Sequence, residues 1–174
     1  MKTFVEIGSC DFDTLAYLSD YGWRGVIVEP HPTYFHNIPL KDNVHYINAA
    51  VDWVDGIRKM WTAPEDVVVE DSDYKGMSTF LKEGNPSLTK VITVPTICFD
   101  TLFKMTDVTD IDYLKIDVEG YDYEILKMFP WDRYRPKNVK FESEHLEDDS
   151  ALQLLKNMGY HCEVDEHNTY AIKL

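Results

Sequence analysis

The chain has 174 residues, and its 31 acidic and 17 basic side chains give a formal net charge of −14 at pH 7. Hydrophobic residues make up 44% of the sequence and aromatic residues 13%, which excludes a disordered chain and suffices for the core of one domain. A field this negative repels phosphate backbones, so we expect no nucleic-acid partner. Small neutral or cationic ligands are compatible with it.

The cysteines and histidines give little support for a disulfide framework or a metal site. Cys10, Cys98 and Cys162 are far apart and form no C-x-x-C pair, which fits a reducing compartment. The six histidines form no H-x-x-x-H pair, so we assign no metal ligand. No apolar signal core or membrane-length run is visible. We therefore expect a soluble, cytoplasmic protein that does not bind membranes.

The first elements predict a strand, a turn, a helix and a second strand. Residues 3–8 are mostly apolar and end at a glycine. Asp11 is a candidate N-cap for a helix over residues 12–21, because Phe12, Leu15 and Ala16 repeat at helical spacing. Residues 25–29 then form a second apolar strand that ends in an acid.

Glu29 follows Gly8 at the spacing seen in nucleotide-type pockets, where an acid accepts hydrogen bonds from ribose hydroxyls. The G-x-G-x-x-G pattern is absent, because Cys10 and Asp13 stand where the later glycines belong. A dinucleotide needs those glycines for close approach of its pyrophosphate. The pattern therefore favours a ligand with ribose but no phosphate. S-adenosylmethionine is such a ligand, and its sulfonium suits acidic surroundings.

The middle of the chain is less regular. A short helix over 34–38 precedes a strand over 44–48, and Ala49 and Ala50 after it could pack against an adenine ring or simply close a tight strand end. Residues 52–96 are predicted to form an irregular excursion over the ligand edge of the sheet, with 57–61 and 91–96 extended. Loops at this edge often bind substrate.

The most informative stretch is Leu-Lys-Ile-Asp-Val-Glu-Gly at 114–120, which predicts a strand running into a turn and then a helix. Asp117 and Glu119 are two residues apart, so an extended chain would point both the same way. Ligands of open α/β sheets bind at such carboxyl ends of strands. An equally simple alternative is that these acids only stabilise the start of the following helix.

The last third of the chain predicts a fifth strand at 139–145, a helix capped by Ser150, and closing strands at 160–164 and 169–174. Glu142, Glu144 and His145 lie in the fifth strand near its end. The alternation of strands and helices followed by a hairpin predicts an α/β fold with a doubly wound, mostly parallel sheet and an antiparallel C-terminal edge. We expect residues 1–174 to form a single domain.

Together these segments resemble the FkbM-type family of S-adenosylmethionine-dependent methyltransferases along nearly the whole chain. The stretch 114–120 is very similar to the family signature L-K-I-D-V-E-G, 5–8 resembles its first cofactor motif, and 28–32 its ribose-binding segment. The family usually has a glycine where this chain has Phe12. The resemblance implies a Rossmann-like class I fold with seven strands. It also implies a cofactor site whose residues here are Glu6, Gly8, Ser9, Cys10, Asp11, Glu29, Pro30, His31, Ala49 and Ala50.

The resemblance further implies methyl transfer to an oxygen of a small molecule or glycan. We expect Asp117 to be the base that accepts the hydroxyl proton, with Glu119 and His145 assisting. Glu119 could instead cap backbone amides, and His145 could be structural. Clustered oxygen ligands could also hold Mg²⁺ or Ca²⁺, although the sequence does not favour it. The rival hypotheses are a non-catalytic domain that keeps the fold, suggested by residues 9–12, and a weakly supported NAD-linked oxidoreductase.

Overall fold

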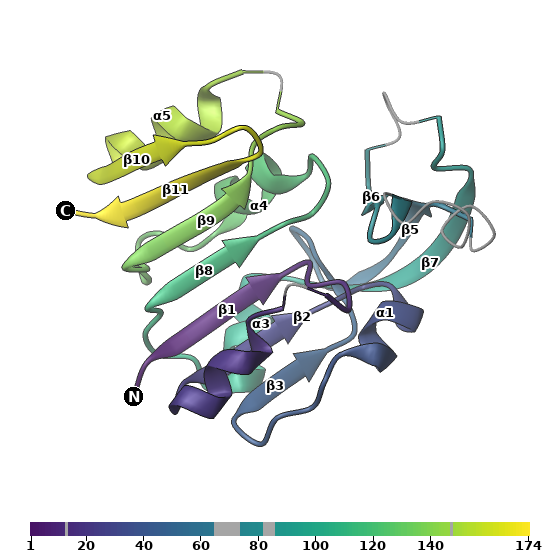
Figure 1. Cartoon of the computed structure of the whole chain (residues 1–174), viewed down its shortest axis with the longest axis horizontal. Coiled ribbons are helices and arrows are strands. Elements are labelled where there is room, and N and C mark those ends of the chain that lie inside the picture. The colour runs from purple at the N-terminus through teal and green to yellow at the C-terminus, as the bar shows by residue number, and fades with distance from the viewer. Residues whose placement is uncertain (13, 65–73, 82–85, 147) are drawn as a thin grey trace.

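The computed structural model describes residues 1–12, 14–64, 74–81, 86–146 and 148–174. Its main feature is a seven-stranded sheet in the order β10-β11-β9-β8-β1-β2-β3 (Figure 1). Neighbouring strands from β9 to β3 are parallel, and β11 is antiparallel to both β9 and β10. The strand bounds are β1 Thr3–Ile7, β2 Arg24–Val28, β3 Val44–Ile47, β8 Tyr113–Ile116, β9 Asn138–Glu142, β10 Tyr160–Val164 and β11 Asn168–Lys173. The predicted seven-stranded, mostly parallel sheet with an antiparallel C-terminal hairpin is confirmed.

Helices cover both faces of this sheet, as a doubly wound fold requires. On one face, η1 (Leu15–Tyr21) packs Leu15 and Ala16 against Phe4 and Ile27. The opposite face carries α3 (Phe99–Thr106), α4 (Asp122–Met128) and α5 (Ser150–Asn157), which share a hydrophobic cluster with β1, β8 and β9. The central strands are buried on both sides, so their sequences are nearly continuous in apolar residues rather than alternating.

A smaller sheet stands beside the large one, in the order β4-β7-β5-β6 (Figure 1). Its strands are β4 (Ala50–Val51), β5 (Gly56–Thr62), β6 (Ser78–Thr79) and β7 (Lys90–Ile97). The expectation of an irregular excursion over 52–96 is therefore wrong for much of this segment, although 57–61 and 91–96 are extended as predicted. The strands form because Met60 and Val94 bury their side chains together with Ala50. Residues 65–73 and 82–85 of the excursion lie outside the described residues.

The first helix is shorter than the sequence suggested. Thr14 is its N-cap and accepts a hydrogen bond from the Ala16 amide, and η1 is a 3₁₀ helix. Asp11, the expected cap, instead pairs with Lys75 at 2.6 Å. Phe12 is 51% exposed and does not join the buried face. Helical spacing alone could not reveal that a carboxylate elsewhere in the fold anchors the start of this turn.

Gly8 allows the loop after β1 to lie directly against the turn after β8. Its φ is +77°, and a Cβ there would lie 1.9 Å from the carbonyl oxygen of Asp117. The amide of Asp117 donates to the carbonyl of Ile7 at 2.9 Å, which extends the β1–β8 pairing up to this point. The two loops that the sequence singled out are therefore adjacent at the carboxyl edge of the sheet. In the described part of the chain, no helix has the length and hydrophobicity needed to cross a membrane.

Candidate active site

A cavity opens at the carboxyl ends of β1, β2 and β8, the edge where ligands bind in open α/β sheets. It encloses about 780 Å³ of space, part of which is open to solvent. Its apolar wall includes residues from both sheets, namely Ile7, Val28, Val51, Met60, Phe80, Val118, Tyr121 and Ile125. Most of the residues predicted from the sequence also line it: Gly8, Ser9, Cys10, Glu29, Pro30, Ala49, Ala50, Asp117 and Glu119.

Glu29 is the buried acid of this cavity. Its Oε2 accepts a hydrogen bond from the amide of Cys10 at 2.8 Å, and its Oε1 accepts one from the amide of His31 at 2.7 Å. Burial raises the pKa of Glu29 to about 7, against the opposing effect of these amides. Each carboxylate oxygen has a second lone pair, so the fixed carboxylate can still accept hydrogen bonds from two ligand hydroxyls.

The loop from Ser9 to Phe12 forms one side of the cavity. Cys10 adopts a left-handed conformation with φ +48°, which is unusual for a residue with a side chain. Burial raises the pKa of its thiol to about 12, and the charges of Asp11 and Glu29 add to the shift. The thiol is therefore neutral at physiological pH. Phe12 also lines the cavity, with its ring half exposed.

The structure does not bring Glu6, Asp11 or His31 into the cavity lining. Glu6 is fully buried, and its carboxylate accepts hydrogen bonds from Thr14 Oγ1 and the Leu15 amide, both at 2.8 Å. It also forms an ion pair with Lys115 at 3.0 Å. Glu6 thus fixes the start of η1 rather than facing a ligand. Asp11, whose side chain is 9% exposed, pairs with Lys75 instead, and His31 stacks on Tyr34 with ring centroids 4.4 Å apart.

Asp117 and Glu119 both face the cavity, but not because they alternate along a strand. Strand β8 ends at Ile116, and the chain then turns through Glu119 at φ +54° and Gly120 at φ +87°. Burial raises the pKa of Glu119 to about 7, and the negative charge of Asp117 contributes. Two carboxylates therefore stand close together at the end of β8, opposite Glu29.

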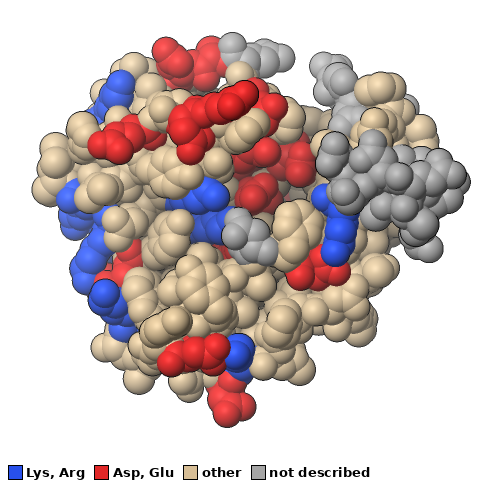
Figure 2. All heavy atoms as spheres, in the orientation of Figure 1, with Lys and Arg blue, Asp and Glu red and all other residues tan. Residues whose placement is uncertain are grey.

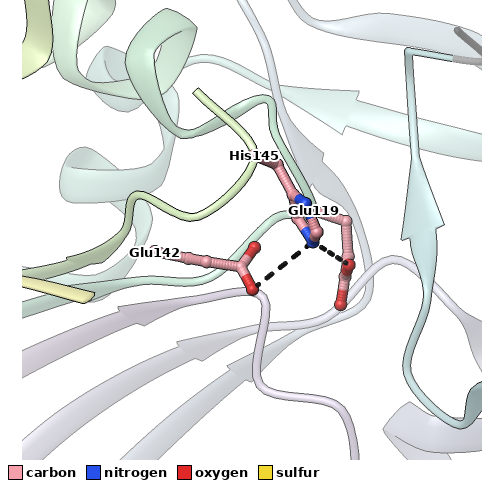
Figure 3. A group of neighbouring side chains, drawn as sticks. All are labelled: Glu119, Glu142 and His145. Carbon is pink, nitrogen blue, oxygen red and sulfur yellow. Dashed lines mark ion pairs between the residues drawn. The ribbon is translucent and has the colours of Figure 1, made fainter. Parts of the chain in front are cut away.

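Strand β9 adds a further acid and a histidine to this group. Because β8 and β9 pair in parallel, their carboxyl ends meet. His145 Nε2 lies 3.7 Å from Glu119 Oε2 and 3.8 Å from Glu142 Oε1, between the two acids (Figure 3). Burial, together with the charges of Glu119 and Asp122, raises the pKa of Glu142 to about 9. His145 does not line the cofactor cavity.

His145 instead lines a second, more open groove beside the cavity. This groove has aromatic walls from β5 and α4, and Phe80 separates it from the cavity by contributing to both. Its lining comprises Trp61, Phe80, Leu81, Gly120, Tyr123, Glu124, His145, Leu146, Asp148 and Ala151. An acceptor entering along this groove would reach the end of β8 from the side opposite Glu29.

An arginine network joins the small sheet to this site, and no sequence motif points to it. Arg58 Nη1 donates to Asp52 Oδ2 at 2.8 Å and to the hydroxyl of Tyr121 at 3.1 Å. Its guanidinium carbon lies 4.0 Å from the centre of the Phe80 ring. The network fixes Phe80 and Tyr121 against the cavity. Of its members only Arg58 lies in β5, and Asp52, Phe80 and Tyr121 lie outside the strands, so the contacts form only in the folded chain.

The surroundings of the site are acidic. Figure 2 shows carboxylates gathered in the hollow at the centre of the face that Figure 1 presents, where the large and small sheets meet. Lysines and arginines on this face lie mainly along the opposite side of the large sheet. Some of the acidic residues that give the chain its net charge of −14 therefore lie where a ligand would enter. Such a field favours cationic and neutral ligands over phosphate-rich ones.

Two solved structures have the same architecture as this chain. One is precorrin-6y C5,15-methyltransferase from Geobacter metallireducens. The superposition covers 99% of this chain and 80% of the methyltransferase chain, with 14% sequence identity and a TM-score of 0.51. The other is a putative methyltransferase from Thermoplasma acidophilum. The superposition covers 99% of this chain and 68% of the Thermoplasma chain, with 11% sequence identity and a TM-score of 0.50. At these identities the likeness shows the fold alone, which is that of class I S-adenosylmethionine-dependent methyltransferases.

The family follows from the sequence model described as "Methyltransferase FkbM domain", which matches residues 6–162. The chain belongs to this family, and the resemblance seen in its motifs is confirmed. Comparison with curated protein sequences gives no match. Family and fold together support S-adenosylmethionine-dependent methyl transfer as the general activity.

The groups that line the cavity suit the parts of S-adenosylmethionine. Glu29 offers fixed, unshared lone pairs to a ribose, and Ala49 and Ala50 leave room for a flat ring. The acids at the end of β8 provide negative potential for a sulfonium. No phosphate-binding arrangement of glycines is needed, because the cofactor carries no phosphate.

The raised pKa of Glu29 predicts an unusual pH dependence of stability in the ligand-free protein. The native state keeps a proton on Glu29 between the unfolded pKa of about 4.5 and the folded pKa of about 7. The native state therefore binds more protons there, and the free energy of unfolding should fall as pH rises through this window. We expect wild type to lose about 2–3 kcal/mol relative to Glu29→Gln between pH 5 and pH 8. Urea unfolding of both proteins measures this, and parallel profiles would refute the raised pKa.

Proposed function

We propose that this protein transfers the methyl group of S-adenosylmethionine to a hydroxyl oxygen of a small molecule or a glycan. The observation that carries the proposal is the pair of carboxylates, Asp117 and Glu119, in the wall of the same cavity as Glu29. An alcohol is a poor nucleophile until a base accepts its proton, whereas a neutral amine needs no such base. Carboxylates at the acceptor side therefore favour an oxygen acceptor.

The residues of the cavity divide into those that hold the cofactor and those that act on the acceptor. Glu29 binds the ribose hydroxyls, and Gly8, Ser9, Cys10, Pro30, Ala49 and Ala50 form the walls around the nucleoside. When bound, the cofactor supplies an electrophilic methyl group on a sulfonium. Asp117 accepts the hydroxyl proton, and Glu119 and His145 orient the acceptor.

The acceptor approaches through the groove beside the cavity. The rings of Trp61 and Tyr123 in its walls offer flat apolar surfaces, which suit the apolar faces of a sugar or an aromatic alcohol. The acidic hollow makes a nucleic acid an unfavourable acceptor. We retain the cytoplasm as the proposed location and residues 1–174 as the proposed domain.

Methyl transfer to an acceptor panel tests this proposal. The purified chain is incubated with methyl-labelled cofactor and matched alcohols, amines and thiols built on the same sugar and aryl skeletons. Label should appear in products that resist alkaline hydrolysis and carry new methyl ethers. Transfer confined to the amines would contradict the choice of oxygen.

A second candidate is a domain that binds the cofactor or a related ligand without catalysis. It is favoured by one observation, the ring of Phe12 in the cavity lining beside the left-handed Cys10. In that case S-adenosylhomocysteine would stabilise the protein thermally, yet no acceptor of the panel would be labelled. Substituting Phe12→Gly would then increase cofactor affinity by removing the ring from the cavity lining.

A further inference from the structure

Three side chains at the border of the two cavities converge as metal ligands do. One oxygen each from Glu119 and Glu142 and a ring nitrogen of His145 lie within 4.8 Å of one another (Figure 3). Ligands around a divalent cation are spaced about 3 Å apart when each is about 2.1 Å from the ion. Small rotations of these side chains would close the group around an ion. Glu119 lies in the turn after β8, and Glu142 ends β9, so the sheet holds both acids in place.

A second observation points to a cation at the same place. Asp122, at the start of α4, is fully buried, and neither of its carboxylate oxygens makes a hydrogen bond of normal geometry with the described residues. The negative charge of Asp122 disfavours ionisation of Glu142. The charges of Asp117 and Glu119 in turn disfavour ionisation of Asp122. Glu142 Oε2 is buried without a partner as well. An unpaired buried carboxylate is costly, so these acids either keep a proton or bind a compensating cation, and the converging ligand atoms at Glu119, Glu142 and His145 offer a place for the cation.

In the described part of the chain, no lysine or arginine forms an ion pair with Glu119, Glu142 or Asp122. The recorded ion pairs of Glu119 and Glu142 are those with His145, and Asp122 has none. A protonated His145 could neutralise one acid, but it is exposed on one side and faces several carboxylates. A divalent ion bound by the imidazole and two carboxylates would balance more of the charge.

We propose that Glu119, Glu142 and His145 bind a divalent cation of the Mn²⁺ type, which holds the hydroxyl of the methyl acceptor. A mixed set of one imidazole and two carboxylates suits Mn²⁺, and three protein ligands leave open positions for oxygen donors. The inference rests on the proposed function for its acceptor, but the metal site itself stands on these side chains alone.

The position of the site gives the ion its role. Glu119 belongs to the wall of the cofactor cavity, and His145 belongs to the wall of the acceptor groove. An ion between them would coordinate a hydroxyl arriving along the groove and polarise it beside Asp117. An acceptor with two adjacent hydroxyls, or a hydroxyl next to a carboxylate, could chelate the ion. Such chelating alcohols are the acceptor class that the site favours.

Titration with Mn²⁺ tests the metal site independently of turnover. The purified chain, treated with a chelator and then exchanged into metal-free buffer, is titrated with MnCl₂ while free Mn²⁺ is followed by electron paramagnetic resonance. We expect one ion per chain with micromolar affinity, and at least a tenfold loss of affinity in both His145→Ala and Glu142→Gln. His161 and Glu163 form an exposed pair with atoms 3.5 Å apart, so His161→Ala and Glu163→Gln serve as matched controls that bind as wild type does.

Circular dichroism and S-adenosylhomocysteine affinity establish that the variants are folded. Because His145 is partly exposed, at least that variant is expected to fold as wild type does. No saturable Mn²⁺ binding below millimolar concentration, or equal binding by wild type and both variants, would overturn the metal site. Absence of O-methyl transfer with Mn²⁺ binding intact would instead overturn the proposed function and leave the metal site standing.

Discussion

Replacing Asp117 by asparagine should reduce methyl transfer by about 100-fold to 10,000-fold, the contribution expected from a positioned general base. Asparagine has nearly the same size but cannot take up the hydroxyl proton. The side chain lines the cavity beyond β8, and β1 separates this strand from β2, which leads to Glu29, so cofactor binding should change little. Turnover at saturating acceptor, together with calorimetric affinity for S-adenosylhomocysteine, separates these two effects.

The matched control for this variant is Asp132→Asn, which changes an exposed acid away from the cavity. It should leave both turnover and affinity unchanged. An Asp117→Asn protein with wild-type turnover would exclude Asp117 as the base. The base would then have to be sought at Glu119.

Replacing Lys115 by alanine should destabilise the fold by about 3–5 kcal/mol, because it leaves a buried carboxylate without its cationic partner. Lys115 is 3% exposed and Glu6 is fully buried, with their charged atoms 3.0 Å apart. Burial raises the pKa of Glu6, and the Lys115 charge opposes that shift. Urea unfolding at pH 7 measures the loss of free energy.

Two further variants identify the cause of this loss. Lys137→Ala removes an exposed lysine that pairs with Asp112, and it should cost less than about 1 kcal/mol. The double variant Glu6→Gln with Lys115→Met removes both charges and should recover much of the stability. If Lys115→Ala costs no more than Lys137→Ala, the buried pair does not support the fold as we describe.

The sheet was predictable because its sequence signals are local. Apolar runs ending at Gly8, Glu29 and Asp117 indicated parallel strands, and the order of strands and helices indicated the doubly wound architecture. The small sheet was not recognised, because its strands are held by partners such as Met60 and Val94 that are far apart in sequence. The helix after β1 was predicted too long for a similar reason, since Thr14 and Glu6 fix its start.

The sequence predicted which acids belong to the site but not how the fold arranges them. Asp117 and Glu119 were expected together from strand alternation, whereas a left-handed turn at Glu119 places them there. Glu6 is an acid within the cofactor motif, but its carboxylate is buried in an ion pair with Lys115 and does not face the cavity. Asp122 has no distinguishing sequence signal, because an acid in the first turn of a helix is ordinary. Only the folded structure shows that Asp122 is buried and that its charge acts on Glu142.

Calorimetric titration with S-adenosylhomocysteine measures whether Glu29 and the surrounding cavity bind this cofactor. Wild type should bind one molecule per chain. Glu29→Ala removes the acceptor of two hydroxyl hydrogen bonds to a charged group, so its affinity should fall by about 100-fold or more. The control Glu163→Gln changes an exposed acid on β10 and should bind as wild type does. Absence of binding by wild type, or equal affinity in Glu29→Ala, would show that this cavity is not the cofactor site.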